Sequence, residues 1–320
     1  MKLFVIRGML LAALAGLTAP VFSAEDTALE PEPGGFSSSR ELYLQVSSRP
    51  EAKLGFTWRF SFPFLQGGHF LTKDNNVSLA LTAEISPISL NGQAEAVWTP
   101  AAFFQLSAGG RIGSGWKLNA FGQEAYGIGL NREKAGASGA AEHAGSVFDG
   151  LLWKTQAGGA LQFDLGTLIP GDWTHVVART YHEINYAGYT AASSNESWYY
   201  ENDDGENTNG FNYYGNFLVG YQMPFFLNMI GLLAEGSVFL YDTPGRGQWG
   251  DDKIQWTFSG LFSFTVTKRI GAVLLVQCRT RRNYTDTNWE DLYYRNRHID
   301  NSNPISLEFY RAAAVLTYKF

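Results

Sequence analysis

Five histidines are the first residues to test for catalysis, because a serine hydrolase needs a histidine within hydrogen-bond reach of its nucleophile. None of them lies beside a serine in a closely spaced His and Ser motif, and the sequence holds no HExxH, Walker-loop or GxSxG motif. A hydrolase would need two residues that are distant in the sequence to meet in space, and we predict no catalytic site. The five are His69, His143, His175, His182 and His298.

An acidic segment over residues 196–210 is the second place where chemistry could occur, because carboxylate oxygens are ligands that calcium prefers. The segment lacks the spacing and the closing glutamate of an EF-type loop, so we favour a solvated acidic loop, with a calcium site as the alternative. His175 and His182 are seven residues apart and fall on opposite faces of a predicted strand, which argues against a shared metal ion. We expect no metal and no cofactor. The acids are Glu201, Asp203, Asp204 and Glu206.

Charged residues recur at alternate positions of the predicted strands, on a face that is otherwise rich in Gly, Ser, Thr, Gln and Asn. Basic residues outnumber acids there by nine to five, although the whole chain carries a formal charge of -6. Such side chains either line a water-filled passage and select solutes by sign, or pair and close a narrow interior. The basic residues are Lys53, Arg59, Arg111, Lys154, Arg179, Arg279, Arg281, Arg311 and Lys319. The acids are Glu84, Glu95, Asp164, Glu183 and Glu235.

The elements that must position these charges are β-strands. Apolar and polar residues alternate from Leu54 to Phe64 and again from Ile254 to Val266. A period of two is the signature of a strand, and no helical spacing appears after the first segment of the chain. Weaker alternation occurs over residues 42–46, 77–85, 92–98, 104–112, 157–163, 176–186, 213–223, 230–240, 272–278 and 310–320.

The connections between these strands differ in length. From residue 150 onward, short and long connections alternate, which is typical of antiparallel strands that cross a membrane with tight turns on the periplasmic side and long loops outside. We predict 12 strands in either of two registers, with 10 or 14 as alternatives, because bacterial barrels are even-numbered. In one register residues 40–49 are the first strand and 113–150 a single loop. In the other the first strand begins near residue 52, and residues 116–131 supply an extra strand.

The first residues predict export. Lys2 and Arg7 precede an apolar run over residues 8–17 that is too short to span a bilayer, and small residues follow it. We therefore predict a signal peptide over residues 1–23. Residues 24–39 are predicted to form a flexible periplasmic tail, with a plug entering the barrel as the alternative, and residues 40–320 to form the folded domain.

The character of the two strand faces distinguishes a membrane barrel from a soluble β-sandwich. One face carries Phe, Trp and Tyr in numbers that would overfill a soluble core, while the other has the sparse charges of a barrel interior. The last strand alternates from Tyr310 and stops at Phe320. It resembles the closing strand of Gram-negative outer-membrane β-barrel proteins, in which a C-terminal Phe is recognised by the barrel assembly machinery. Only Tyr318 and Phe320 match as a motif, and the resemblance implies an all-β, transmembrane, antiparallel barrel in the cell outer membrane.

We expect such a barrel to pass small hydrophilic solutes, as a porin does. The alternatives are a structural or adhesive barrel with a closed lumen and aromatic binding loops, or an outer-membrane hydrolase. The expected partners are outer-membrane lipid, the assembly machinery and small solutes. Nucleic acid is excluded because 24 basic residues stand against 30 acids. The residues predicted to line the lumen are Arg59, Arg111, Arg179, Arg279, Arg281 and Arg311, opposed by Glu95, Glu183 and Glu235.

Overall fold

The structure of the protein is a computed structural model. It describes residues 35–49, 51–69, 71–120, 123–131, 148, 150–193, 196–201, 203–240, 247–285 and 298–320. The predicted signal peptide and residues 24–34 of the predicted tail lie outside the described residues. No described helix is long and apolar enough to cross a bilayer.

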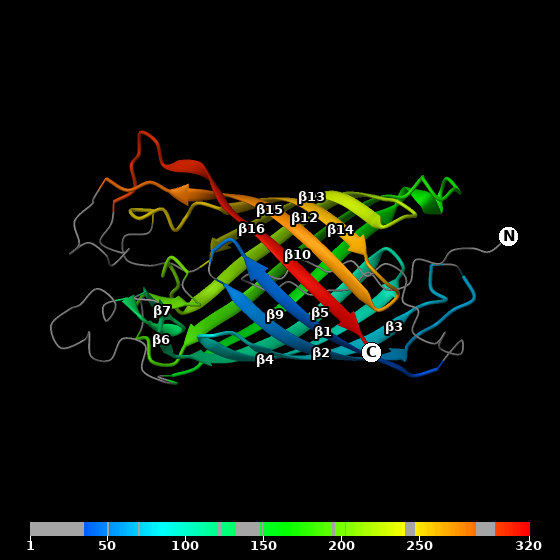
Figure 1. The fold of residues 1–320 in the computed structure, drawn as a ribbon, viewed down its shortest axis with the longest axis horizontal. Helices are drawn as coiled ribbons and strands as arrows, with labels where there is room; N and C mark the ends of the chain where they lie inside the picture. Colours follow the sequence, from blue (N-terminus) through cyan, green and yellow to red (C-terminus); the bar gives the residue numbers. More distant parts are fainter. Residues whose placement is uncertain are drawn as a thin grey trace.

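Twelve antiparallel strands form a closed barrel (Figure 1). Each strand pairs with its neighbours along the chain, and the first strand pairs with the last, with Leu42 opposite Tyr318. Closure leaves no strand edge with unpaired backbone groups, which is the condition for presenting strands to lipid. The strands are β1 (Ser37–Ser47), β2 (Ala52–Pro63), β3 (Asn76–Ile85), β4 (Ser89–Ala101), β5 (Phe104–Gly115), β9 (Leu152–Asp164), β10 (Val176–Tyr189), β12 (Gly210–Gln222), β13 (Leu227–Phe239), β14 (Gln255–Thr265), β15 (Ile270–Arg282) and β16 (Ile305–Lys319).

The predicted count of 12 strands and the all-β barrel class are confirmed. Of the two registers, the one with a first strand near residues 40–49 is correct. The alternative, with a barrel strand over residues 116–131, is wrong. That stretch instead forms the short strands β6 (Lys117–Ala120), β7 (Gln123–Tyr126) and β8 (Ile128–Leu130), which pair outside the barrel sheet.

The two faces of the wall have the polarity of a membrane barrel. Apolar side chains point outward and are exposed, as at Leu232, which is 73% exposed. Inward side chains are polar and buried, with Glu183 and Arg311 each only 1% exposed. Aromatic residues lie toward both ends of the outer face, with Trp153 stacked on Tyr186 at 4.9 Å between ring centroids near the loop end and Trp173 6.0 Å from Phe225 near the other end. The outward face is therefore suited to lipid and the interior to polar contacts.

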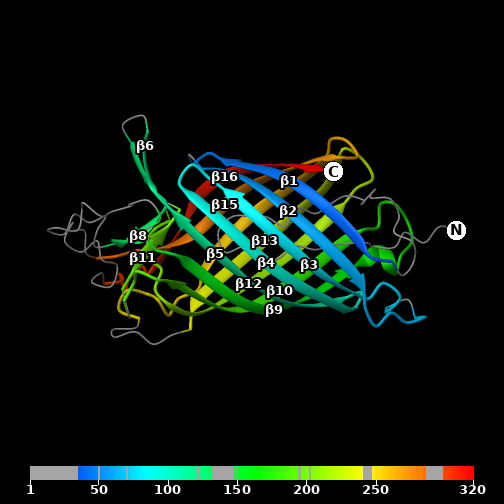
Figure 2. The same ribbon diagram turned by 90° about the horizontal axis from the view of Figure 1, so that it is seen from below.

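The two ends of the barrel differ. One end, called here the loop end, is where the chain passes from β5 to β9, from β10 to β12, from β13 to β14 and from β15 to β16 by longer connections, and from β1 to β2 and β3 to β4 by short ones. At the other end, the terminal end, β16 finishes and a short 3-10 helix η1 (Leu165–Thr167) lies in the β9–β10 connection. At the loop end, β8 pairs with β11 (Trp198–Tyr200) from the β10–β12 connection (Figure 2).

Candidate functional site

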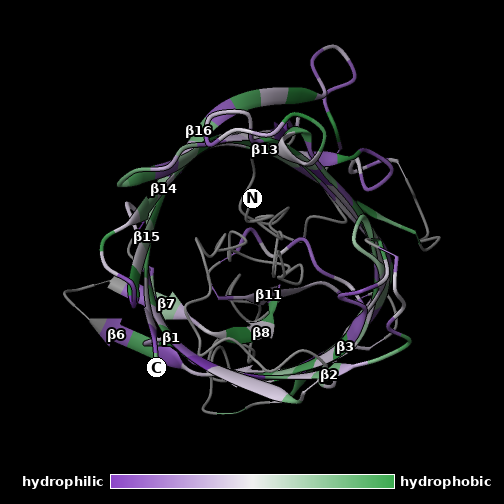
Figure 3. Ribbon diagram, turned by 90° about the vertical axis from the view of Figure 1, so that its right-hand side faces the viewer, coloured by the Kyte–Doolittle hydropathy of each residue, from purple (hydrophilic) through white to green (hydrophobic). Residues whose placement is uncertain are grey.

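The part of the β10–β12 connection over residues 196–201 and 203–209, called here the strap, is held at the loop end by apolar packing. Trp198 of β11 packs in a buried cluster with Ile128, Leu130, Leu152 and Tyr189. In a view along the barrel, β8 and β11 lie within the outline of the wall (Figure 3). The strap is therefore fixed across the opening instead of extending away from it.

One carboxylate inside the strap organises its tight turn. Asp203 accepts hydrogen bonds from the backbone nitrogens of Tyr200 at 3.0 Å and Gly205 at 2.9 Å. Asn207 also donates its side-chain amide to Asp203 at 2.6 Å. Asp203 shapes the strap and leaves Glu201, Asp204 and Glu206 free to reach the wall.

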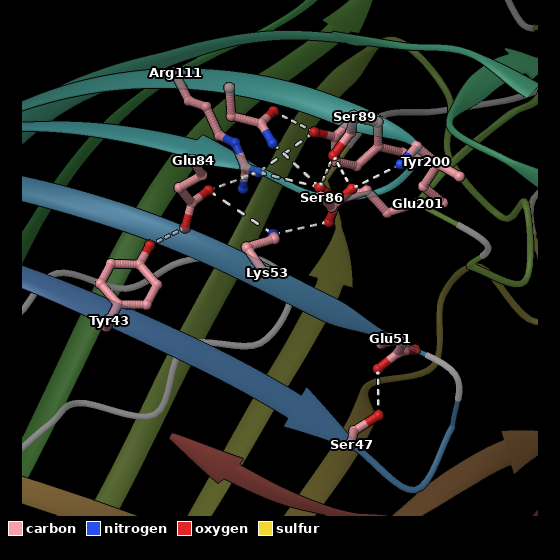
Figure 4. A network of polar contacts seen from close by, with 12 residues as sticks. Tyr43, Ser47, Glu51, Lys53, Glu84, Ser86, Ser89, Arg111, Tyr200 and Glu201 are labelled. Atoms are coloured by element: carbon pink, nitrogen blue, oxygen red, sulfur yellow. Dashed lines mark hydrogen bonds and ion pairs between the residues drawn. The ribbon is translucent and has the colours of Figure 1, made fainter. Parts of the chain in front are cut away.

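Glu201 joins the strap to the wall formed by β2, β4 and β5 (Figure 4). Its carboxylate lies 2.9 Å from Lys53 Nζ and 3.9 Å from a guanidinium nitrogen of Arg111. Ser89 Oγ donates to it at 2.6 Å and Asn91 Nδ2 at 3.1 Å. Burial alone would raise the pKa of Glu201, but the charges of Lys53 and Arg111 outweigh it and lower the pKa to about 2.

A second carboxylate in the wall shares the same two cations. Glu84 lies 3.2 Å from Arg111 and 3.8 Å from Lys53, and it accepts a hydrogen bond from the hydroxyl of Tyr43. Two carboxylates and two cations therefore form one neutral cluster. Glu201 enters it with a backbone φ of +49°, a left-handed conformation that costs a non-glycine residue about 1 kcal/mol.

The other two strap acids reach the wall on the β14–β15 side. Asp204 lies 2.7 Å from Arg279, which also pairs with Glu308 at 2.9 Å. Glu206 pairs with Arg282 and accepts hydrogen bonds from Gln255 Nε2 at 2.7 Å and from the hydroxyl of Tyr284 at 2.9 Å. In the order of strands around the barrel, β14 and β15 are separated from β4 and β5 by β13, β12, β10 and β9 in one direction. The strap thus bridges two separate sectors of the wall.

Below the strap, buried carboxylates bind neighbouring donors. Glu183 lies 2.7 Å from Lys154 Nζ and accepts hydrogen bonds from the Tyr181 hydroxyl and from Asn185, both at 2.9 Å. Glu235 accepts from the hydroxyl of Tyr214 at 2.6 Å. On another sector Arg311 donates to Gln277 and pairs with Glu51, both at 2.7 Å. Much of the interior charge is therefore paired within the wall.

Arg179 is the exception among the predicted lumen arginines. It is 8% exposed, and its guanidinium lies over the ring of Tyr181 at 5.5 Å. No carboxylate of the described residues forms an ion pair with it. Arg59, Arg179 and Glu183 are the charged groups that act on Glu95, which lies at the centre of β4 and is 2% exposed. With Lys154, which pairs with Glu183, three cations face two carboxylates in this middle layer.

The structure places the other predicted lumen residues in three environments. Arg111, Arg311 and Glu183 are buried inside the wall, whereas Arg59, Glu235 and Arg279 are half-buried. Arg281 does not lie in the interior, because its side chain is 65% exposed and pairs with Glu308 at 3.5 Å at the rim. Its neighbour Arg282, which alternation did not select, is buried. At this strand end the loop residues Trp249 and Gly250 pack on Arg282 and override the alternation.

The expectation of a solvated acidic loop is wrong for Glu201 and Glu206, whose carboxylates are largely buried against cations of the wall. The calcium alternative receives no support, since no group of three or more His, Cys, Asp and Glu among the described residues could hold a metal ion. The aromatic side chains of Trp198, Tyr199 and Trp249 are buried as well. They pack inside the loop end and do not form an exposed surface.

One histidine forms an arrangement that the search for serine missed. His182 points outward from β10, with Nε2 at 2.9 Å from Thr180 Oγ1 and Nδ1 at 2.6 Å from the hydroxyl of Tyr213. A search for threonine two positions before a histidine would have found it. His175 instead pairs with Asp164 at 2.8 Å at the terminal end. His143 lies outside the described residues.

These observations define the class of the protein: a transmembrane β-barrel of the outer-membrane type, as the closing strand predicted. No protein-family model and no curated protein matches the chain. Among solved structures it is similar to the KdgM porin, with 9% identity, 89% of this chain and 99% of that chain covered and a TM-score of 0.36. It is also similar to LpxR from Salmonella typhimurium, with 9% identity, coverage of 89% and 100% and a TM-score of 0.40. The class assignment rests on the closed sheet and its two faces.

Proposed function

We propose that this protein is an outer-membrane channel for small hydrophilic solutes with a preference for anions, its loop end facing outward. The observation that carries the proposal is Arg179, which is buried in the interior and forms no ion pair with a described carboxylate. A buried cation without a carboxylate partner attracts anions through a low-dielectric interior. The same layer also holds Arg59 and Lys154 against Glu95 and Glu183, so its net charge is one positive and an anion passing through meets attraction there.

Conductance across a planar bilayer tests the proposal. We expect the refolded barrel to give discrete single-channel steps, and a reversal potential in a potassium chloride gradient that shows anion preference. Arg179→Gln should move the reversal potential toward zero, because the unpaired charge is lost. Lys268→Gln removes an exposed cation from the turn at the terminal end and should leave the reversal potential unchanged. Absence of any step from demonstrably folded protein would contradict the proposal.

A second candidate function, ester hydrolysis at the lipid-facing wall, is favoured by the chain of hydrogen bonds through His182. The Thr180 hydroxyl would attack an ester carbonyl and pass its proton to His182, while Tyr213 holds the ring. The alcohol of the ester would leave with that proton, so that the acyl group is bound to Thr180. Water would then hydrolyse this acyl-threonine and release the acid. Thr180→Val and His182→Ala should abolish lipid hydrolysis by vesicle-embedded protein, whereas His69→Ala, in an exposed connection, should not. Equal turnover by all three variants and wild type would exclude this site.

A further inference from the structure

We infer that the strap occupies a binding site for a soluble oligocarboxylate, and that its own carboxylates stand where those of the solute bind. The inference rests on the proposed function and names the class of solute. Three strap acids each pair with different cations at the opening of the loop end, called here the mouth. Glu201 pairs with Lys53 and Arg111, Asp204 with Arg279, and Glu206 with Arg282.

The cations of the mouth have partners besides the strap: carboxylates of the wall and, for Arg282, the β13–β14 loop. Glu84 binds both Arg111 and Lys53, at 3.2 and 3.8 Å. Glu308 binds Arg279 at 2.9 Å. The backbone carbonyl of Gly250 accepts from Arg282 at 2.7 Å. Their side chains therefore keep their positions when the strap moves, which preorganises them for another ligand.

The charge balance favours an anionic replacement. Without the strap, the five cations Lys53, Arg111, Arg279, Arg281 and Arg282 face two wall carboxylates, Glu84 and Glu308, so five minus two leaves three positive charges. Uncovering buried cations is strongly unfavourable unless a new partner arrives. A solute that carries several carboxylates along one chain supplies that partner on both sectors of the mouth at once. A monovalent anion satisfies only one position and binds correspondingly more weakly.

The structure of the strap allows its carboxylates to be exchanged for those of the solute. Its acids are joined by a short segment with the turn closed by Asp203, so they leave or return together. Glu201 is held in a left-handed backbone conformation, which relaxes once its side chain is released. The solute thus competes with a tethered set of identical groups, and removing those groups must strengthen its binding.

Calorimetric titration of the purified barrel in detergent with hexaglutamate tests this inference. We expect the triple variant Glu201→Gln, Asp204→Asn, Glu206→Gln to bind hexaglutamate at least about tenfold more tightly than wild type. Asp204→Asn alone removes a half-exposed contact and should bind hexaglutamate about threefold more tightly than wild type. This single variant tests the inference if the triple variant does not fold. Arg279→Gln should bind more weakly than wild type. Asp252→Asn, an exposed acid of the neighbouring loop paired with Lys253, is the matched control and should bind as wild type does.

Three results would overturn the inference. The first is that neither strap variant binds hexaglutamate more tightly than wild type, and the second is that hexaglutamine binds as tightly as hexaglutamate. The third is that the strap variants gain affinity only for detergent-dispersed phosphatidic acid, which would assign the site to lipid phosphates. The titration does not require conduction, so the two proposals fail separately. A folded barrel that binds hexaglutamate as expected but stays silent in bilayers contradicts the channel alone. A conducting barrel whose strap variants bind no more tightly contradicts the oligocarboxylate site alone.

Discussion

Replacing Glu183 with leucine should destabilise the barrel strongly, because it leaves the ammonium of Lys154 buried without its carboxylate. The two groups are 2.7 Å apart, and their side chains are 0% and 8% exposed. At an effective dielectric constant of about 20, this separation gives an attraction of about 6 kcal/mol. Because part of that attraction only offsets the removal of both charges from water, breaking the pair from one side typically costs about 3–5 kcal/mol. We expect a loss of that size in the free energy of unfolding.

A double-mutant cycle measures this effect. The free energy of unfolding would be determined by urea titration in phospholipid vesicles for wild type, Glu183→Leu, Lys154→Met and the double variant. The double variant removes both charges and should recover most of the stability that either single variant loses, giving a coupling energy of about 3 kcal/mol. A coupling below about 1 kcal/mol is the value for exposed pairs. That result would refute our reasoning and show that water surrounds the pair.

Three further outcomes follow from contacts in the wall and the strap. Gly55→Ala should lower the free energy of unfolding by about 1–3 kcal/mol in the same titration, because an added Cβ would lie 2.1 Å from the ring of Tyr43; unchanged stability would show that the ring has room to move. Phe320→Ala should reduce the yield of folded barrel in outer membranes while the yield of refolding in vitro stays that of wild type. An equal loss of both yields would show that Phe320 acts on the stability of the barrel and not on its assembly. The pKa of Glu201 is lowered, so its stabilising contact persists above about pH 4.5 and is lost as the pH falls toward 2. Thermal scans of Glu201→Gln should lack that loss at low pH, and a pH profile equal to that of wild type would contradict it.

The wall could be predicted from the sequence because lipid imposes a simple rule on it. Every second residue from Leu54 to Phe64 must be apolar, and the same rule marks the other strands. The rule did not distinguish the two registers, because residues 116–131 also contain short strands. These strands pair outside the barrel sheet. The alternation of apolar and polar residues identifies strands from the local sequence, but it carries no information about which strands pair.

The mouth could not be predicted, because its contacts join residues that are distant along the chain. Lys53 and Glu201 are 148 positions apart, and neither residue type nor spacing links them. Glu201, Asp203, Asp204 and Glu206 were visible as a group, but their partners depend on how β8 and β11 pair. Arg281 and Arg282 show the same limit at a strand end, where loop packing decides which side chain turns inward.

The pairing of the first strand with the last also governs the order in which the molecule can fold. Leu42 and Tyr318 are partners although their sequence separation is 276 (318 minus 42), so this closing contact joins residues near opposite ends of the chain. Contacts of such separation form late, because the entropy of closing a long loop is lost before any stabilisation is gained. Until they form, β1 and β16 each present unpaired backbone groups that another strand could bind. A chain of this topology therefore gains from a template that occupies one edge until the other arrives.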